Sequence, residues 1–131
     1  MNTSAFLILR LAIAISMLGH GLVRLPKLNA FSQWMIGSFE KTMLPKTLVV
    51  AFSYALPFAE FTVGLLLLTG LFTKPAAIAG ATVVLFLLFG TTMIENWEAV
   101  PSQFLHIIFF AILLQFIENN TYALDKIYIN K

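Results

Sequence analysis

Long apolar runs separated by short polar stretches dominate this sequence. The run at 75–94 contains no ionisable side chain, and about 20 apolar residues are enough to span the hydrocarbon core of a bilayer. Runs of comparable length predict four membrane-spanning helices, at residues 3–25, 48–71, 75–94 and 101–117. We therefore expect an all-α integral membrane protein, in which a single domain, residues 1–131, forms a four-helix bundle with both termini on one side of the membrane.

The segment between the first two predicted spans has a different pattern. In residues 29–44, apolar side chains recur at helical spacing with polar ones between them, which is typical of an amphipathic helix that lies in the membrane interface. The apolar stripe consists of Phe31, Trp34, Met35, Phe39 and Met43. We expect this interfacial helix to cap one end of the bundle, and a loop with scattered aromatic residues is the alternative.

The composition fits a lipid environment and excludes several classes of function. Apolar residues make up 60% of the chain and charged residues 11%, whereas roughly 25% of residues are charged in globular domains. The chain has no cysteine, which excludes disulfides, thiolate metal sites and iron–sulfur ligation. Its net charge of +2 comes from scattered positions, so we expect no nucleic-acid partner.

Basic residues are divided almost evenly between the two sides of the membrane. The first loop carries Arg24, Lys27, Lys41 and Lys46, and the terminal side carries Lys74, Lys126 and Lys131. Arg10 lies near the start of the first span and adds to the terminal side. Because cytoplasmic loops carry an excess of Lys and Arg, we expect the termini in the cytoplasm. Arg10 inside the first apolar run also argues for a retained helix and against a cleaved signal peptide.

Arg10 and Glu60 are the fully charged residues deepest in the apolar runs. An unpaired arginine at the bilayer centre costs about 2.5 to 3.5 kcal/mol on insertion scales, so it should face inward and find a partner. Counted from the terminal side of two antiparallel helices, the residues lie at depths of about 10 and 15 Å, a difference that arginine can bridge. We therefore predict a buried Arg10–Glu60 ion pair that holds the bundle together.

A second set of polar residues gathers towards the other side of the membrane. His20 lies near the end of the first span and His106 near the start of the fourth, so alternating helix directions bring them to one depth. Arg24, which follows His20 by four residues, and the residues of the connection before His106 belong to the same layer. The resulting candidate ligand-binding residues are His20, Arg24, Glu95, Trp97, Gln103 and His106.

Three interpretations of this layer are open. Two histidines with a carboxylate could hold a metal, or two imidazoles could ligate haem, but no local spacing motif supports either, so we predict no metal site and rank haem below other ligands. Histidine and arginine beside aromatic side chains suit the headgroup and tail of a quinone or lipid. The third interpretation is that these side chains reach to water and hold the loops together.

Several short motifs, in this order and spacing, resemble the DoxX-like membrane proteins of bacteria. The stretch His20 to Arg24 is similar to the family's His-Gly-x-x-Lys/Arg, and the stretch Tyr122 to Asp125 is similar to its Ser-Leu-Asp ending. The other positions that carry the resemblance are Arg10, Glu60, Gly64, Gly70, Thr73, Lys74, Ala76 and Ala77. His106 and the Glu95 to Glu98 connection depart from the commoner family pattern.

The resemblance implies a four-helix bundle in the bacterial inner membrane and a connection with redox chemistry, because the family is named after a subunit associated with a quinone-reducing oxidoreductase. We predict an accessory subunit of a membrane redox system that binds a quinone or similar lipid near the outer face. The chain has no cofactor motif, so electrons would come from a partner redox protein or a bound cofactor, and a second copy of the chain is a further expected partner. The alternatives are a non-catalytic scaffold or assembly factor and a small-solute transporter with a water-filled cavity reaching Arg10 and Glu60.

Overall fold

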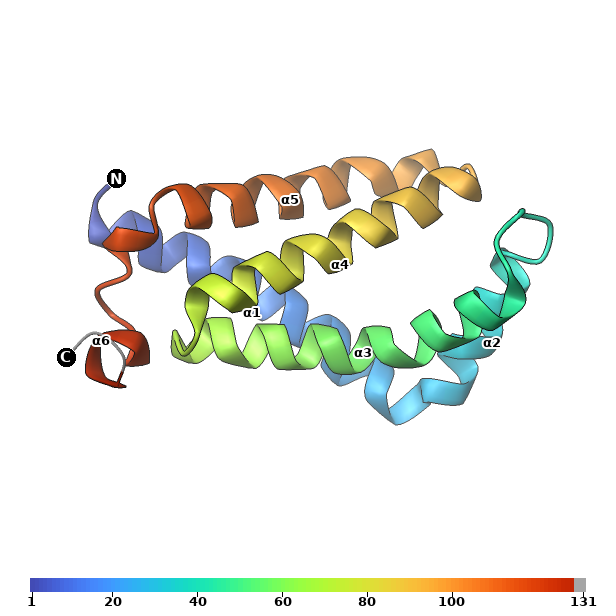
Figure 1. Cartoon of the computed structure of the whole chain (residues 1–131), viewed down its shortest axis with the longest axis horizontal. Helices are drawn as coiled ribbons and strands as arrows, with labels where there is room; N and C mark the ends of the chain where they lie inside the picture. Colours follow the sequence, from blue (N-terminus) through green and yellow to red (C-terminus); the bar gives the residue numbers. More distant parts are fainter. Residues whose placement is uncertain (129–131) are drawn as a thin grey trace.

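The computed structural model describes residues 1–128, and all the regular elements in this part of the chain are helices (Figure 1). In chain order they are α1 (Thr3–Arg24), η1 (Leu25–Lys27), α2 (Leu28–Ser38), α3 (Lys46–Thr69), α4 (Thr73–Met93), η2 (Trp97–Ala99), α5 (Val100–Gln115), η3 (Ile117–Asn119) and α6 (Leu124–Tyr128). Four helical segments are long and apolar enough to cross a membrane. They confirm the four predicted spans, with closely similar bounds.

The four long helices form two antiparallel pairs. α1 packs chiefly on α3, and α4 packs chiefly on α5. The pairs come together at the end of the bundle that carries the N-terminus and α6, and towards the other end α4 and α5 diverge from α3 (Figure 1). α2 and the loop after it lie at that diverging end, where α2 packs beside α3.

Two glycines set the register of α1 against α3. Gly21 lies against the backbone of Phe61, and Gly64 lies against the backbone of Leu18, so closely that a methyl group at either glycine would overlap the neighbouring helix. Small residues allow this approach of helix backbones in membranes. The buried apolar core around this contact comprises Phe6, Ile13, Ala14, Met17, Val63, Leu67, Ala76, Ala77, Val84, Phe110 and Leu113.

A polar network closes the end of the bundle that carries the termini. Asp125 accepts hydrogen bonds from the backbone N–H groups of Phe72 and Thr73, at 2.6 and 2.9 Å, where α4 begins. Asn120 donates to the hydroxyl of Thr73 and to the carboxylate of Asp125. Phe72 has no side-chain oxygen with which to cap α4, so a carboxylate from a distant part of the sequence satisfies these free donors.

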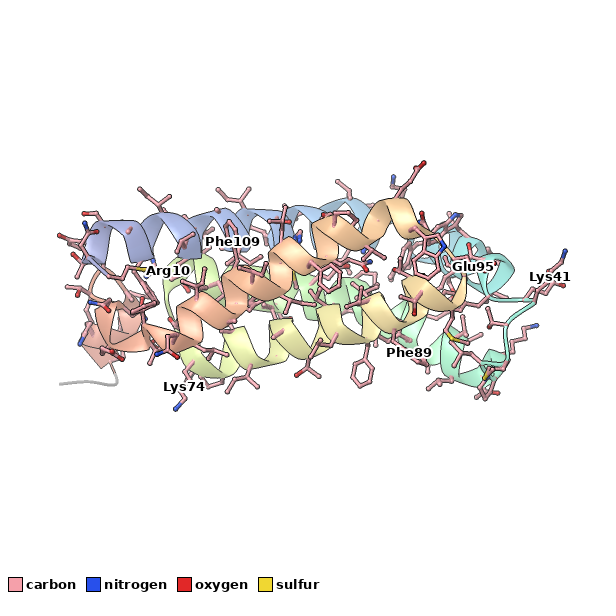
Figure 2. All side chains as sticks on the ribbon, turned by 90° about the horizontal axis from the view of Figure 1, so that it is seen from above. Arg10, Lys41, Lys74, Phe89, Glu95 and Phe109 are labelled. Atoms are coloured by element: carbon pink, nitrogen blue, oxygen red, sulfur yellow. The ribbon has the colours of Figure 1, made fainter. Side chains whose placement is uncertain are left out.

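Arg10 belongs to this network, and the predicted Arg10–Glu60 ion pair is wrong. Arg10 Nη1 donates to Asn120 Oδ1 at 2.8 Å and to the Tyr122 carbonyl at 2.9 Å. The register of α1 and α3 brings Arg10 beside Gly70, and Glu60 lies ten residues away, about 15 Å along a helix. Counting depth from the helix ends missed this offset. Figure 2 shows Arg10 near the closed end of the bundle.

α2 begins at Leu28, one residue before the predicted interfacial segment 29–44, and ends at Ser38. Met35 is buried as the stripe predicted, whereas Trp34 is 58% exposed and Met43 is 84% exposed. Ser32 is buried instead, and its hydroxyl lies 2.7 Å from that of Ser53 on α3. The side of α2 that faces α3 therefore carries Ser32 beside Met35, and Trp34 of the predicted stripe lies at the surface of the bundle.

Candidate ligand-binding site

The diverging helix pairs enclose a cavity of about 730 Å³. Side chains from α1, α2, α3, α4 and the start of α5 line it, and most of them are apolar. The polar lining residues are His20, Arg24, Glu60, Thr91, Asn96, Ser102, Gln103 and His106. The cavity lies in the half of the bundle that holds Phe89 and Glu95, away from Arg10 and Lys74 (Figure 2).

Glu60 pairs with Arg24 from the end of α1. Arg24 Nη1 lies 2.7 Å from Glu60 Oε1, and the side chains are 26% and 3% exposed respectively. The guanidinium of Arg24 also lies 4.6 Å from the centre of the Phe31 ring, within the range of a favourable cation–π contact. Both charges of this pair therefore belong to the cavity lining, where sequence analysis had placed only Arg24.

The two histidines come together across the bundle, as predicted, with ring centres 6.2 Å apart. His20 Nδ1 lies 2.7 Å from the Ser16 carbonyl, and His106 Nδ1 lies 2.8 Å from the Ser102 carbonyl. A carbonyl oxygen can only accept, so Nδ1 carries a proton in both rings, and a ring that holds no second proton has Nε2 as an acceptor. His106 Nε2 is 2.6 Å from the Ser16 hydroxyl, whereas His20 Nε2 has no hydrogen-bond partner within residues 1–128.

Gln103 presents an unsatisfied acceptor in the same lining. Its Nε2 donates to the Thr91 hydroxyl at 2.8 Å. Its Oε1 is buried and has no hydrogen-bond partner among the residues that the structure describes. A buried acceptor without a donor is energetically unfavourable, by about 1 to 3 kcal/mol. One end of the Gln103 amide is therefore bonded to Thr91, and no described residue bonds the other end.

Glu95 and Trp97, two of the six candidate residues, do not line the cavity. Both lie in the connection between α4 and α5 and are exposed, Trp97 by 61%. Glu95 adopts a left-handed backbone conformation with φ 57°, and its neighbour Asn96 lines the cavity instead. The sequence placed them at the right depth, but depth alone does not fix the direction of a side chain in a turn.

The arrangement of the two histidines limits how a metal ion or haem could bind. Within residues 1–128, no group of three His, Asp or Glu side chains could hold a metal ion. Haem ligation by both imidazoles would use Nε2, because each Nδ1 is bonded to a carbonyl oxygen. It would therefore require His106 to give up its hydrogen bond with Ser16.

Sequence analysis missed two residues that orient this site. Ser16 bonds His106 through its hydroxyl, and Thr91 bonds Gln103. Ser16 lies four residues before His20 and so shares its face of α1, a spacing that could have indicated its role. Thr91 and its partner lie on different helices, so no local spacing links them.

The family of the chain follows from its first four helices. Residues 5–94, more than half of the chain, match the family model described as DoxX. The chain belongs to the DoxX family. With its four long apolar helices, this DoxX-family protein is a multi-pass membrane protein. A comparison with curated proteins gave no match, and neither did a comparison with solved structures.

The family match divides the cavity into two parts. His20, Arg24 and Glu60 lie inside the matched region, whereas Gln103 and His106 on α5 lie beyond it. The ion pair thus stands on helices that the family model describes, and the unsatisfied acceptor of Gln103 stands on a helix that it does not cover.

Proposed function

We propose that this DoxX-family protein binds a quinone or a similar amphipathic lipid in the cavity and serves as an accessory subunit of a membrane redox system. One observation carries the proposal: an apolar cavity of about 730 Å³ has a few convergent polar groups at one part of its wall. Sites for small organic ligands are typically of about 300 to 1,000 Å³, apolar, with a small number of polar groups that orient the ligand.

The polar part of the lining suits a headgroup. Arg24 offers N–H donors besides the one that Glu60 accepts, His20 offers its Nε2, and Gln103 offers its side-chain amide. These three side chains come from α1 and α5, on one side of the cavity. An oxygenated ring placed there would exchange hydrogen bonds with several of them at once, which gives a defined orientation.

The opposite part of the lining suits an apolar tail. Leu48 of α3 and Phe86 and Phe89 of α4 line the cavity, and each is more than half exposed. A cavity bordered by residues that also face the surroundings opens sideways between α3 and α4. In a bilayer this opening faces lipid, so an isoprenoid or acyl tail can leave the cavity without meeting water.

The chain itself brings no redox centre in this proposal, so electrons reach the bound quinone from a partner protein or a cofactor bound elsewhere. The expected location is the bacterial inner membrane, with the termini in the cytoplasm and the cavity towards the outer face. The transporter alternative required a cavity that reaches both Arg10 and Glu60. The observed cavity is lined by Glu60 and not by Arg10, so it does not support that alternative.

Extraction of the purified protein tests the proposal. The protein is isolated in mild detergent from membranes that contain quinone, and the co-purified quinones and lipids are quantified by mass spectrometry. We expect about one quinone or similar lipid per chain, and a loss of most of it in the double variant His20→Ala, His106→Ala. The matched control is Thr82→Ala, Gln115→Ala, at two exposed positions on α4 and α5 outside the cavity.

The outcomes separate the candidate functions. Ligand that is retained by the control and lost from the histidine variant supports binding in the cavity. A visible Soret band that is lost in the histidine variant would identify the ligand of the site as haem. A colourless protein with no bound quinone or lipid, unaffected by either set of substitutions, would refute the proposal and favour a scaffold without an ordered ligand.

A further inference from the structure

The two histidines of the cavity differ in the hydrogen bonds that their rings already make. His106 uses both nitrogens, since Nδ1 lies 2.8 Å from the Ser102 carbonyl and Nε2 lies 2.6 Å from the Ser16 hydroxyl. His20 uses only Nδ1, which lies 2.7 Å from the Ser16 carbonyl. The His20 ring lines the cavity and is exposed. Among the residues that the structure describes, Nε2 of His20 is therefore the imidazole nitrogen that remains available to a ligand.

From this difference we infer that His20 donates a hydrogen bond to a bound quinone through Nε2, so that quinone binding takes up a proton, whereas His106 links α5 to α1 through Ser16 and does not touch the ligand. The inference rests on the proposed function and names how protons regulate the same site. A quinone oxygen can only accept a hydrogen bond, so Nε2 must carry a proton to bond it. Because Nδ1 already donates to the Ser16 carbonyl, the ring that bonds a quinone holds two protons and a positive charge.

The contact between His20 and the Ser16 carbonyl makes the second proton necessary. A neutral ring could donate from Nε2 only if Nδ1 gave up its proton, which would leave two acceptors 2.7 Å apart. Two acceptors at that distance repel each other, so the contact would have to break. Imidazole side chains generally change charge between about pH 5 and 8. Since a quinone binds the doubly protonated ring, its affinity should be greatest below this range and should fall as the pH rises through it.

Few other titratable groups face His20. His106 faces it from α5, with ring centres 6.2 Å apart, and a charge on either imidazole interacts with Glu60 of α3. Arg24 lies one turn further along α1, and its charge is paired with Glu60. Within the described residues, α2 and α4 contribute no titratable side chain to the lining, and Glu95 lies outside it, as does Glu98. The carboxylate favours a charged imidazole and the guanidinium disfavours it, so a test must separate the titration of His20 from that of Glu60 and His106.

Titration calorimetry on the full chain in detergent tests the inference, with a benzoquinone that carries a decyl tail as the probe. Dissociation constants are measured between about pH 5.5 and 8.5, and buffers of different ionisation enthalpy give the number of protons taken up per quinone bound. We expect the quinone to bind at least about tenfold more tightly at the low end of this range and to take up as much as about one proton within it. Decylbenzene has the ring and the tail without the oxygens, so it should bind without proton uptake and independently of pH.

Matched substitutions at the two histidines assign the proton. His20→Gln puts an amide in place of the imidazole, and its N–H group donates without titrating, so the quinone should still bind but without pH dependence or proton uptake. His106→Gln makes the same change at the facing ring and should keep both effects, because His20 is intact. Glu60 is intact in both variants, so a pH dependence that arises from its carboxylate would survive in both.

The results distinguish this inference from the proposal on which it rests. Proton uptake that is present in the wild-type protein and in His106→Gln, and absent from His20→Gln, supports the inference. Loss of quinone binding in His20→Gln, with decylbenzene binding intact, also supports the contact. Uptake that persists in His20→Gln or disappears in His106→Gln would overturn it, as would binding of the quinone to the wild-type protein without uptake. Failure of the quinone to bind the folded wild-type protein at any pH in the range would refute the proposed function itself.

Discussion

Removing the carboxylate of Asp125 should open the closed end of the bundle. Asp125 accepts two backbone hydrogen bonds at the start of α4 and a third from Asn120. Hydrogen bonds to charged groups contribute about 1.5 to 3 kcal/mol each, so the two backbone bonds alone give about 3 to 6 kcal/mol. Phe72 is 51% exposed, which allows water to replace part of its bond. We therefore expect Asp125→Ala to lower the free energy of unfolding by about 3 kcal/mol.

Unfolding in mixed micelles measures this loss. The purified variants are titrated with a denaturing detergent, and helix content by circular dichroism gives the free energy of unfolding. Lys126→Ala is the matched control, because it changes the next residue, which is exposed and makes no side-chain hydrogen bond within residues 1–128. Asp125→Asn keeps an acceptor but loses the charge that favours the N-terminus of α4, and it should fall between the two.

The comparison can refute the reasoning. If Asp125→Ala unfolds within about 1 kcal/mol of Lys126→Ala, the carboxylate does not hold the closed end, because surface substitutions usually stay within that range. If Asp125→Asn is as damaging as Asp125→Ala, the charge rather than the hydrogen-bond geometry carries the effect.

Two further predictions concern the contact between α1 and α3. Arg24→Glu and Glu60→Arg should each destabilise the fold by about 3 kcal/mol, since breaking a buried pair costs about 3 to 5 kcal/mol and Arg24 is partly exposed. The double exchange should recover about half of the loss in the same unfolding assay, and no recovery would contradict the pairing. Gly64→Ala should destabilise by about 1 to 3 kcal/mol through overlap with α1. Gly37→Ala, with nothing within 4 Å of the new methyl group, should be neutral or stabilising, and equal effects at the two glycines would argue against close packing.

The spans could be predicted from the sequence because the signals that define them are local. Apolar length fixes where a helix can cross, and single residues mark where it stops. Gly70 ends α3 in a left-handed conformation with φ 73°, which glycine adopts without strain. Pro75 lies in the first turn of α4, where its missing N–H group is not needed. Neither inference needs a partner from elsewhere in the chain.

The partners of the buried charges could not be predicted in this way. Glu60 and Gly64 are four residues apart and therefore share one face of α3, but the sequence does not show that Gly64 packs against Leu18. The helix register that this contact sets brings Glu60 beside Arg24 and leaves it far from Arg10. Helical periodicity shows which residues share a face, whereas register between helices depends on where small and large side chains from distant segments fit together.

Arg10 enters the membrane well before its partners have been made. Asn120 follows it by 110 residues, and ribosomes add about 5 to 20 residues per second, so about 6 to 20 s of synthesis separate the two. Glu60, by contrast, follows Arg24 by only 36 residues, which corresponds to about 2 to 7 s of synthesis at the same rate. During its longer interval the guanidinium of Arg10 depends on water and lipid headgroups at the membrane surface. Arg10 can therefore become fully buried only after residues 120–125 have been synthesised. The closed end of the bundle is assembled after α1 and α3 have begun to pair.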